Sequence, residues 1–423
     1  MIRGVAAGGL SIALCLVAVP ALITAPALAG ATRASAAVST TGAPGATERS
    51  PGLPDPTGSC TPPAPGSDPQ SDPNLLKAAT GTPWAQTMLS YPSVWRLTEG
   101  GGETVALIDS GVDANPQLNG RVVVGQTLAN APSGPANGDC VGHGTLAAGL
   151  IAASSKNGGM GGMAPQATIY SEKVTNSESV NVDTLATAIN DAVAAHVQVI
   201  SMSIASAQGD ENLAAAVQNA LSNNIVVVAA AGNDTLNQHG QVTKAGPFYP
   251  ASYPGVLSVG AVDDTGALAD FSDHKSQVDV TAPGVAVTST YPGTNGDSYA
   301  ADAGTSFATP LVAGLAALVR ARYPQLSAAQ VVARIEETAD GNEGPGTGYG
   351  LIDPVQALTA VIPANGKSQS ASVTINRPAT NGTQKEITVA LAGGAVAIVA
   401  IVLAAAVVIP AGRRRRWRPG GLD

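Results

Sequence analysis

The sequence predicts an α/β domain built on a mostly parallel sheet, and three observations carry this prediction. Between residues 84 and 362, short runs of apolar, β-branched residues alternate with longer segments of helical character. The runs are apolar throughout, which is typical of strands buried on both faces of a sheet. Aromatic residues make up only 3% of the chain while Gly and Ala abound, which favours close packing of helices on that sheet. We therefore expect three layers, with helices on both faces.

The chain begins with a segment, residues 1–29, that has the form of a secretory signal peptide. An arginine near the start precedes an apolar run, and the segment closes on Ala27-Leu28-Ala29. A retained membrane anchor is the alternative, but the prolines and the small-residue ending favour cleavage. Residues 30–83 are rich in Ala, Pro, Gly, Ser and Thr and have no apolar periodicity, so we expect an extension without a core of its own.

Residues 84–362 should form the folded domain. We expect strands at 103–111, 168–174, 197–206, 224–233 and 255–262, and helices at 142–154, 182–196, 211–222 and from about 306 to Pro324. In parallel-sheet folds, functional groups stand in the loops after the carboxyl ends of strands. Asp109 and Asn233 both follow apolar runs and should therefore lie at that edge of the sheet.

The C-terminal part predicts a single membrane span. Residues 363–386 have the polar composition of a linker, and residues 387–409 form an uncharged apolar run of about 23 residues, enough to cross a core of roughly 30 Å. A buried core helix is the alternative, but the length of the run without a charge argues against it. The arginine-rich residues 410–423 should form a cytoplasmic tail by the positive-inside rule, which leaves the domain outside the cell membrane.

Charge and cysteine content narrow the range of partners and ligands. The formal net charge is −9 and basic residues cluster only at the C-terminus, which argues against nucleic acid as a partner. Cys15 lies in the predicted signal peptide, so Cys60 and Cys140 remain as a pair, and in an exported protein a disulfide is favoured over free thiols. Cys140 and His143 form half of a metal motif, but no second Cys/His pair completes it, and we expect neither a metal nor a cofactor.

Ser306 is the first candidate for a catalytic residue. It lies in Gly304-Thr305-Ser306-Phe307-Ala308-Thr309-Pro310, where a tight turn should lead into a helix with Pro310 in its first turn. The unpaired N–H groups of a helix N-terminus favour the negative charge that develops when a serine attacks a carbonyl. A structural N-capping serine is the alternative, and the choice depends on a base that activates the hydroxyl.

His143 and Asp109 are the candidates for that base and its partner. His143 stands between two glycines at a transition from loop to helix, whereas His196, His239 and His274 occupy helix-end or loop positions typical of structural or surface residues. Asp109 ends an apolar strand, where a buried carboxylate can orient the imidazole, although a turn-forming aspartate is the alternative. For a histidine paired in this way we expect a pKa near 7, so that hydrolysis rises through that pH.

Asn233 is the candidate for binding an oxyanion. It follows the apolar strand that ends in Ala230-Ala231-Gly232, and its side chain could donate to a developing negative charge together with the N–H of Ser306. Such a pair lowers a barrier by several kcal/mol. A turn-forming asparagine is the alternative for this residue taken alone.

These segments together resemble the subtilisin-like serine protease family. The resemblance rests on DSGVD, GHGTLAAG, GMAPQATIYSEKV, ISMSIAS, AAAGN and GTSFATP, and the chain order Asp, His, Ser is that of subtilisin. It implies the three-layer subtilisin-like fold and an endopeptidase that cleaves proteins through an acyl-enzyme. It also implies that Ser203, Ile204, Ala205 and Gly232 bind the substrate, with Ala205 where a glycine is usual.

The order of segments along the chain is similar to that of the mycosins, membrane-anchored subtilisin-like proteases associated with actinobacterial type VII secretion. This resemblance implies a type VII membrane complex as a partner. It also implies an extension that lies along the domain, fastened by the pairing of Cys60 with Cys140, instead of a removable inhibitor. A structural component of the secretion complex, with dispensable protease activity, is the competing interpretation.

Overall fold

The structure is a computed structural model. It describes residues 81–128, 138–155, 160–175, 180–236, 242–244, 246–272, 278–292, 299–342 and 346–362. The predicted signal peptide, residues 30–80 of the extension, the linker, the apolar run 387–409 and the basic tail lie outside the described residues, so these parts of the chain stay predictions. Among the helices that are described, none is long and apolar enough to cross a membrane.

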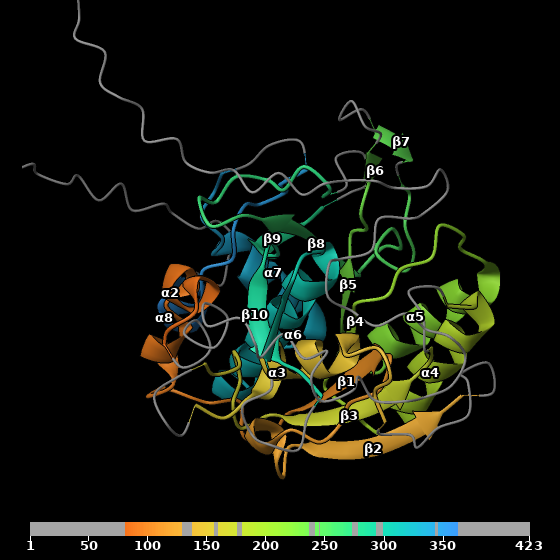
Figure 1. The fold of residues 1–423 in the computed structure, drawn as a ribbon, viewed down its shortest axis with the longest axis horizontal. Coiled ribbons are helices and arrows are strands. Elements are labelled where there is room, and N and C mark those ends of the chain that lie inside the picture. The colour runs from red at the N-terminus through yellow and green to blue at the C-terminus, as the bar shows by residue number, and fades with distance from the viewer. Residues whose placement is uncertain are drawn as a thin grey trace, which may run out of the picture. The chain divides into compact units, whose positions relative to one another are not determined.

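A seven-stranded sheet forms the centre of the domain (Figure 1). Its strands, in spatial order, are β2 (Val122–Thr127), β3 (Thr168–Lys173), β1 (Thr104–Asp109), β4 (Val199–Met202), β5 (Val226–Ala230), β8 (Leu257–Val262) and β9 (Val280–Pro283). Every pairing between these neighbours is parallel. This confirms the predicted mostly parallel α/β sheet. From β1 the chain builds one side of the sheet with β2 and β3, and from β4 it builds the other side with β5, β8 and β9. The switch point of the sheet, where ligands bind in such folds, therefore lies between β1 and β4.

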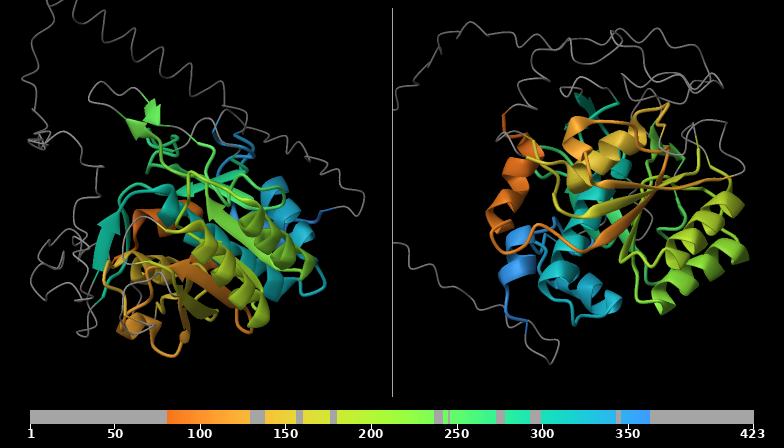
Figure 2. Two further views of the ribbon diagram at one scale, coloured as in Figure 1. Left: turned by 90° about the vertical axis from the view of Figure 1, so that its right-hand side faces the viewer. Right: turned by 90° about the horizontal axis from the view of Figure 1, so that it is seen from below.

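Two apolar cores cover the two faces of the sheet, which confirms the three layers. Val105 and Leu107 of β1 belong to the core with α3 (His143–Ala152) and α6 (Thr305–Arg322), while Ala106 and Ile108 belong to the other core. That second core contains the inner faces of α4 (Val182–Ala194) and α5 (Glu211–Ser222), which lie side by side in Figures 1 and 2. Successive residues of one strand therefore supply opposite cores, as the pleat requires.

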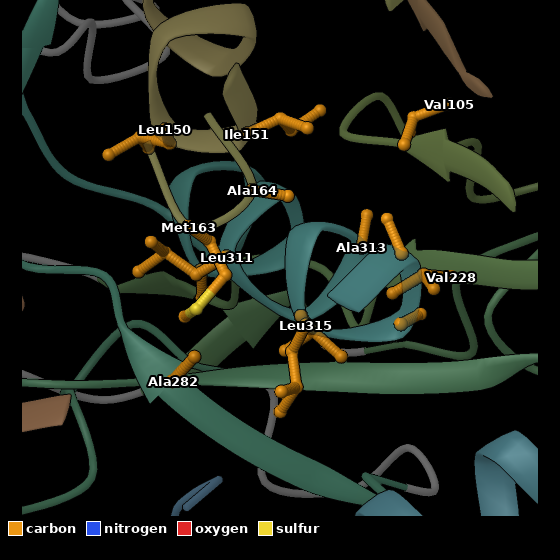
Figure 3. Close-up of a cluster of buried hydrophobic side chains, with 14 of the residues drawn as sticks. Val105, Leu150, Ile151, Met163, Ala164, Val228, Ala282, Leu311, Ala313 and Leu315 are labelled. Atoms are coloured by element: carbon orange, nitrogen blue, oxygen red, sulfur yellow. The ribbon is translucent and has the colours of Figure 1, made fainter. Parts of the chain in front are cut away.

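Helix α6 is the most deeply buried helix of the first core. Figure 3 shows Leu311, Ala313 and Leu315 between α3 and the sheet, with Ile151 of α3 and Val228 of β5 nearby. All five residues are fully buried. Burying a leucine side chain stabilises a fold by about 1.5–3 kcal/mol, so this packing fixes α6, and with it Ser306, relative to the sheet.

The remaining described elements surround this framework. They are α2 (Trp84–Leu89), η2 (Tyr91–Val94), η3 (Pro116–Leu118), β6 (Thr235–Leu236), β7 (Val242–Lys244), β10 (Val287–Thr290), β11 (Tyr299–Asp302), α7 (Ala328–Glu337) and α8 (Pro354–Thr359). Helix α8 packs on η2, so the last described helix lies beside the N-terminal part of the domain (Figure 2). Arg334 of α7 donates hydrogen bonds to the carbonyls of Ala357 and Ala360 and holds α8 in place.

The predicted elements agree with the structure except in two respects. The first is that several elements were not expected from the sequence: strands β2, β6, β7, β9, β10 and β11 and helices α2, α7 and α8. The second difference concerns Pro310, which lies inside α6 and not in its first turn, because the helix begins at Thr305. Since proline has no N–H, the usual helical hydrogen bond to the carbonyl of Ser306 is missing. Ser306 nevertheless stands in the first turn, where the sequence places it.

Candidate active site

Asp109 and His143 form the hydrogen bond that the sequence predicts. Oδ1 of Asp109 lies 2.7 Å from Nδ1 of His143. The carboxylate is fully buried at the end of β1, whereas the imidazole keeps 15% of its surface exposed at the start of α3. The N–H of Ser110 also donates to Oδ1, over 2.7 Å, and holds the carboxylate in place. With Nδ1 occupied in this way, Nε2 is the nitrogen that can accept a proton.

The glycines on either side of His143 allow this contact. Gly142 has φ +90°, and a β-carbon there would lie 2.2 Å from the ring of Tyr291. A β-carbon on Gly144 would lie 2.0 Å from the carbonyl oxygen of Gly111 and 3.2 Å from Oδ1 of Asp109. Only residues without a side chain let the loop before α3 pass this close to the end of β1.

The surroundings of His143 change the pKa of its imidazole. Burial lowers the pKa of His143 because it disfavours the charged imidazolium. The charge of Asp109, its hydrogen bond, and the charges of Asp302 and Asp139 together outweigh burial and raise the pKa of His143 to about 9. The value near 7 expected from the sequence is therefore wrong, because that expectation did not include the further acidic groups around the ring.

The raised pKa predicts an alkaline pH dependence. A histidine acts as a general base only when it is neutral, so any rate that depends on His143 should rise about tenfold per pH unit below pH 9 and level off above it. The rate of covalent labelling by a fluorophosphonate, measured between pH 6 and 10.5, checks this. A plateau already reached at pH 7.5 would contradict the effect of the surrounding carboxylates.

Asn233 and Ser306 lie on either side of Gly304. A β-carbon on Gly304 would lie 2.8 Å from Oγ of Ser306 and 3.3 Å from Nδ2 of Asn233, so both atoms border the small space that this glycine leaves open. Phe307, the next residue along α6, packs its ring on that of His143 with the centroids 4.8 Å apart. The described geometry thus brings residues from β1, α3, α6 and the end of β5 to one place.

The amide of Asn233 has a fixed orientation. Its Oδ1 accepts hydrogen bonds from the N–H of Thr305, over 3.0 Å, and from the hydroxyl of Thr305, over 2.9 Å. The same hydroxyl accepts a hydrogen bond from the N–H of Gly232 at 3.2 Å. Both partners of Oδ1 can donate, which agrees with an oxygen at that position of the amide. The other amide atom, Nδ2, therefore faces Gly304 and can donate to a ligand.

The residues predicted to bind substrate follow β4 and β5. Ser203 and Ile204 are buried directly after β4, and Ala205 is half-buried beside them. Gly232, at φ +104°, packs against the ring of Phe248, which would lie 2.0 Å from a β-carbon at that position. Phe248 was missed because nothing in its local sequence connects it with Gly232. The role of these residues in substrate binding stays a prediction.

The structure describes only some of the other histidines and cysteines that the sequence analysis considered. His196 is exposed beyond the end of α4, while His239 and His274 lie outside the described residues. Cys140 is nearly buried in the loop before α3. Cys60 lies outside the described part of the chain, so its pairing with Cys140 stays a prediction.

The chain belongs to the subtilase family of serine proteases. The sequence pattern of that family, Peptidase S8, matches residues 100–383. Thermitase of Thermoactinomyces vulgaris is 40% identical over 276 residues, which cover 64% of this chain and 93% of thermitase. A thermostable alkaline protease of Halalkalibacterium halodurans is 39% identical over 255 residues, which cover 60% of this chain and 66% of that protease. The chain is thus a subtilisin-like serine endopeptidase by family.

Within this family, the mycosin resemblance is also confirmed. The solved structure of the MycP3 protease from the type VII (ESX-3) secretion system superposes with a TM-score of 0.58 at 31% sequence identity. The match covers 67% of this chain and 89% of MycP3. It therefore spans the greater part of both chains.

Proposed function

We propose that the chain is a membrane-anchored, extracytoplasmic endopeptidase that cleaves protein substrates with Ser306, His143 and Asp109. The hydrogen bond between Asp109 and His143, beside the space bordered by Asn233 and Ser306, is the observation that carries this proposal. These four residues come from four separate parts of the chain and supply the donors and acceptors that acyl transfer requires.

The chemistry follows from the position of each group. Oγ of Ser306 attacks the carbonyl carbon of the scissile peptide bond while Nε2 of His143 takes the hydroxyl proton, and Asp109 stabilises the imidazolium that forms. The oxyanion accepts hydrogen bonds from Nδ2 of Asn233 and from the N–H of Ser306 at the start of α6. His143 then gives the proton to the leaving amine. Water, activated in the same way by His143, hydrolyses the acyl-enzyme and restores Ser306.

The substrate should bind as an extended peptide along the segment after β4. Ser203, Ile204 and Ala205 provide backbone groups there, and Gly232, packed on the ring of Phe248, brings the chain to Asn233. The β-carbon of Ala205, where relatives usually have glycine, narrows the cleft and favours substrates with small side chains next to the cleaved bond. Ser206 adds support, because its N–H and C=O exchange hydrogen bonds of 2.8 and 2.7 Å with Tyr249.

The location of the enzyme is proposed from the sequence and from its relatives. The predicted signal peptide, the apolar run 387–409 and the basic tail together support a domain on the outer side of the cell membrane, with the C-terminus in the cytoplasm. The likeness to MycP3, a protease from a type VII secretion system, supports a secretion complex of that type as the partner. A disulfide between Cys60 and Cys140 would fasten the extension to the loop before His143.

Labelling of Ser306 tests this proposal. A fluorophosphonate should modify Ser306 in the purified full chain, because only an activated serine reacts with it. Peptide mapping of the same sample under non-reducing conditions should recover Cys60 and Cys140 in one linked peptide pair. A folded protein that is not labelled at Ser306 would contradict the catalytic proposal, and free thiols at both cysteines would contradict the disulfide alone.

A further inference from the structure

A second buried carboxylate, Asp139, lies four residues before His143. It is only 1% exposed, and its two oxygens accept five hydrogen bonds. Oδ1 accepts from the hydroxyl of Ser110 at 2.9 Å and from the N–H groups of Val141 at 3.1 Å and Gly142 at 2.8 Å. Oδ2 accepts from the N–H and the hydroxyl of Thr145, at 2.8 and 2.7 Å. A buried carboxylate requires donors of this kind, and here they come from two separate elements.

The network joins the strand that carries Asp109 to the helix that carries His143. On the strand side, the hydroxyl of Ser110 is bound to Asp139 and accepts the N–H of Gly144 at 2.9 Å. On the helix side, the hydroxyl of Thr145 is bound to Asp139 and accepts the N–H of Asp113 at 3.0 Å. Asp139 therefore lies at the centre of two bridges that fix the first turn of α3 against the end of β1.

Lys173 supports the same loop from β3. This lysine is fully buried, and its ammonium donates a hydrogen bond to the carbonyl of Gly138, next to Asp139. Its register partner in the sheet is Asp109, so the lysine lies at the same end of the strands. Asp139 and Asp113 both favour the charged form of Lys173, against the effect of its burial. The charged groups near Asp139 are thus Lys173, Asp113, His143 and, through the hydroxyl of Ser110 that both carboxylates contact, Asp109.

We propose that Asp139 is a positioning residue for the protease reaction: it holds His143 at hydrogen-bond distance from Asp109 and adds a negative charge that favours the imidazolium. This inference rests on the proposed function of Ser306 and His143. Asp139 does not touch the substrate. It acts on His143 through the loop geometry and through its charge, and its charge adds to those of Asp109 and Asp302 around the imidazole.

Asp139→Asn tests the two effects together. The amide can offer only one oxygen, so its NH2 group must face N–H donors, either those of Val141 and Gly142 or that of Thr145. In the purified full chain, the fluorophosphonate labelling rate at its high-pH plateau should fall about tenfold or more, because small displacements of a catalytic group are costly. The pH of half-maximal labelling should move down, because a nearby negative charge is lost.

Two further variants separate position from charge. Asp139→Glu keeps the charge, so it should lower the plateau and leave the pH of half-maximal labelling unchanged. Asp353→Asn is the matched control: Asp353 is the N-cap of α8 and accepts the N–H of Gln356 at 2.9 Å, away from the site. Because asparagine caps a helix as well as aspartate does, this variant should leave the melting temperature, the plateau and the pH midpoint nearly unchanged.

The outcomes are distinguishable. If Asp139→Asn lowers the melting temperature but keeps the wild-type plateau and pH midpoint per folded molecule, Asp139 is only structural and the inference is wrong. If this variant does not fold, Ser110→Ala decides: it removes the 2.9 Å bridge to Asp139 and the longer 3.3 Å contact with Asp109, and it keeps both carboxylates and the N–H that holds Asp109. A plateau lowered severalfold by Ser110→Ala supports the inference, and an unchanged plateau overturns it. Absence of labelling in the wild type would instead contradict the proposed function itself.

Discussion

Replacing Ser306 with alanine should abolish hydrolysis of peptide substrates, with a loss in kcat on the order of 10⁶. The reason is that Ser306 supplies the nucleophilic oxygen of the acyl-enzyme, so the remaining rate would come from substrate binding and the oxyanion donors alone. Asn233→Ala should be milder, about 10²–10³ in kcat, because it removes one donor and leaves the nucleophile. Turnover of a fluorogenic peptide library by the full chain measures both.

The control for this prediction is Ser327→Ala. Ser327 also stands at the N-terminus of a helix, where its hydroxyl accepts the N–H of Gln330 in a capping box of α7. Its loss should cost about 1 kcal/mol of stability and leave kcat unchanged. In cells, secretion that continues with Ser306→Ala while substrate processing stops would favour a scaffold role for the rest of the chain. A Ser306→Ala protein that retains wild-type turnover would contradict the proposed mechanism.

Gly142→Ala should have the second largest effect. The new β-carbon would meet the buried ring of Tyr291 at 2.2 Å, in addition to the strain of an L-residue at φ +90°. We expect a loss of about 3–4 kcal/mol in the free energy of unfolding, of which overpacking contributes about 2 or more. The loop would also shift His143 relative to Asp109 and lower kcat by about 100-fold. Thermal unfolding and peptide turnover check these values.

Gly102→Ala isolates the steric part of this effect. Gly102 has the same φ of +90°, but a β-carbon there would meet nothing within 4 Å. It should therefore cost about 1 kcal/mol from backbone strain and leave turnover at the wild-type level. Equal losses of stability in the two variants would mean that the contact with Tyr291 is unimportant.

The extent to which sequence predicts this fold depends on how a strand is buried. Strands β1, β4 and β5 consist mostly of apolar residues because both faces are covered, and they were predicted. Strand β2 lies at the edge of the sheet, and its Val123 and Val124 are 50% and 48% exposed, so its residues show no burial pattern. Local sequence does not reveal which apolar run will become an edge strand.

Strand β10 was missed for a different reason. It consists of Val287-Thr288-Ser289-Thr290, which resembles a loop, yet all four residues are buried. The hydroxyls of Ser289 and Thr290 donate to the carbonyls of Leu146 and Thr145 in α3, at 2.8 Å each. Polar residues in a buried strand become understandable only when their acceptors, far away in the chain, are known.

The candidate site also contains residues that could be predicted from the sequence and one that could not. Asp109, His143, Asn233 and Ser306 could be predicted because each stands in a short segment of distinctive composition at the end of a strand or the start of a helix. Asp139 could not, because an aspartate in a glycine-containing loop is typical of an ordinary turn. Its five donors lie on Ser110, Val141, Gly142 and Thr145, and the Ser110 link requires the folded structure.

The order of strands in the sheet has a consequence for when the enzyme can act. Strand β1 pairs with β3 on one side and with β4 on the other, and α6, which packs on β4, β5, β8 and β9, comes after all of them in the chain. Asp109 therefore meets Ser306 only when nearly the whole domain has been made and folded. Contacts so distant in sequence form slowly, since long loops must close first. A chain that crosses the membrane unfolded would thus carry no assembled nucleophile and could not cut proteins on the side where it was synthesised.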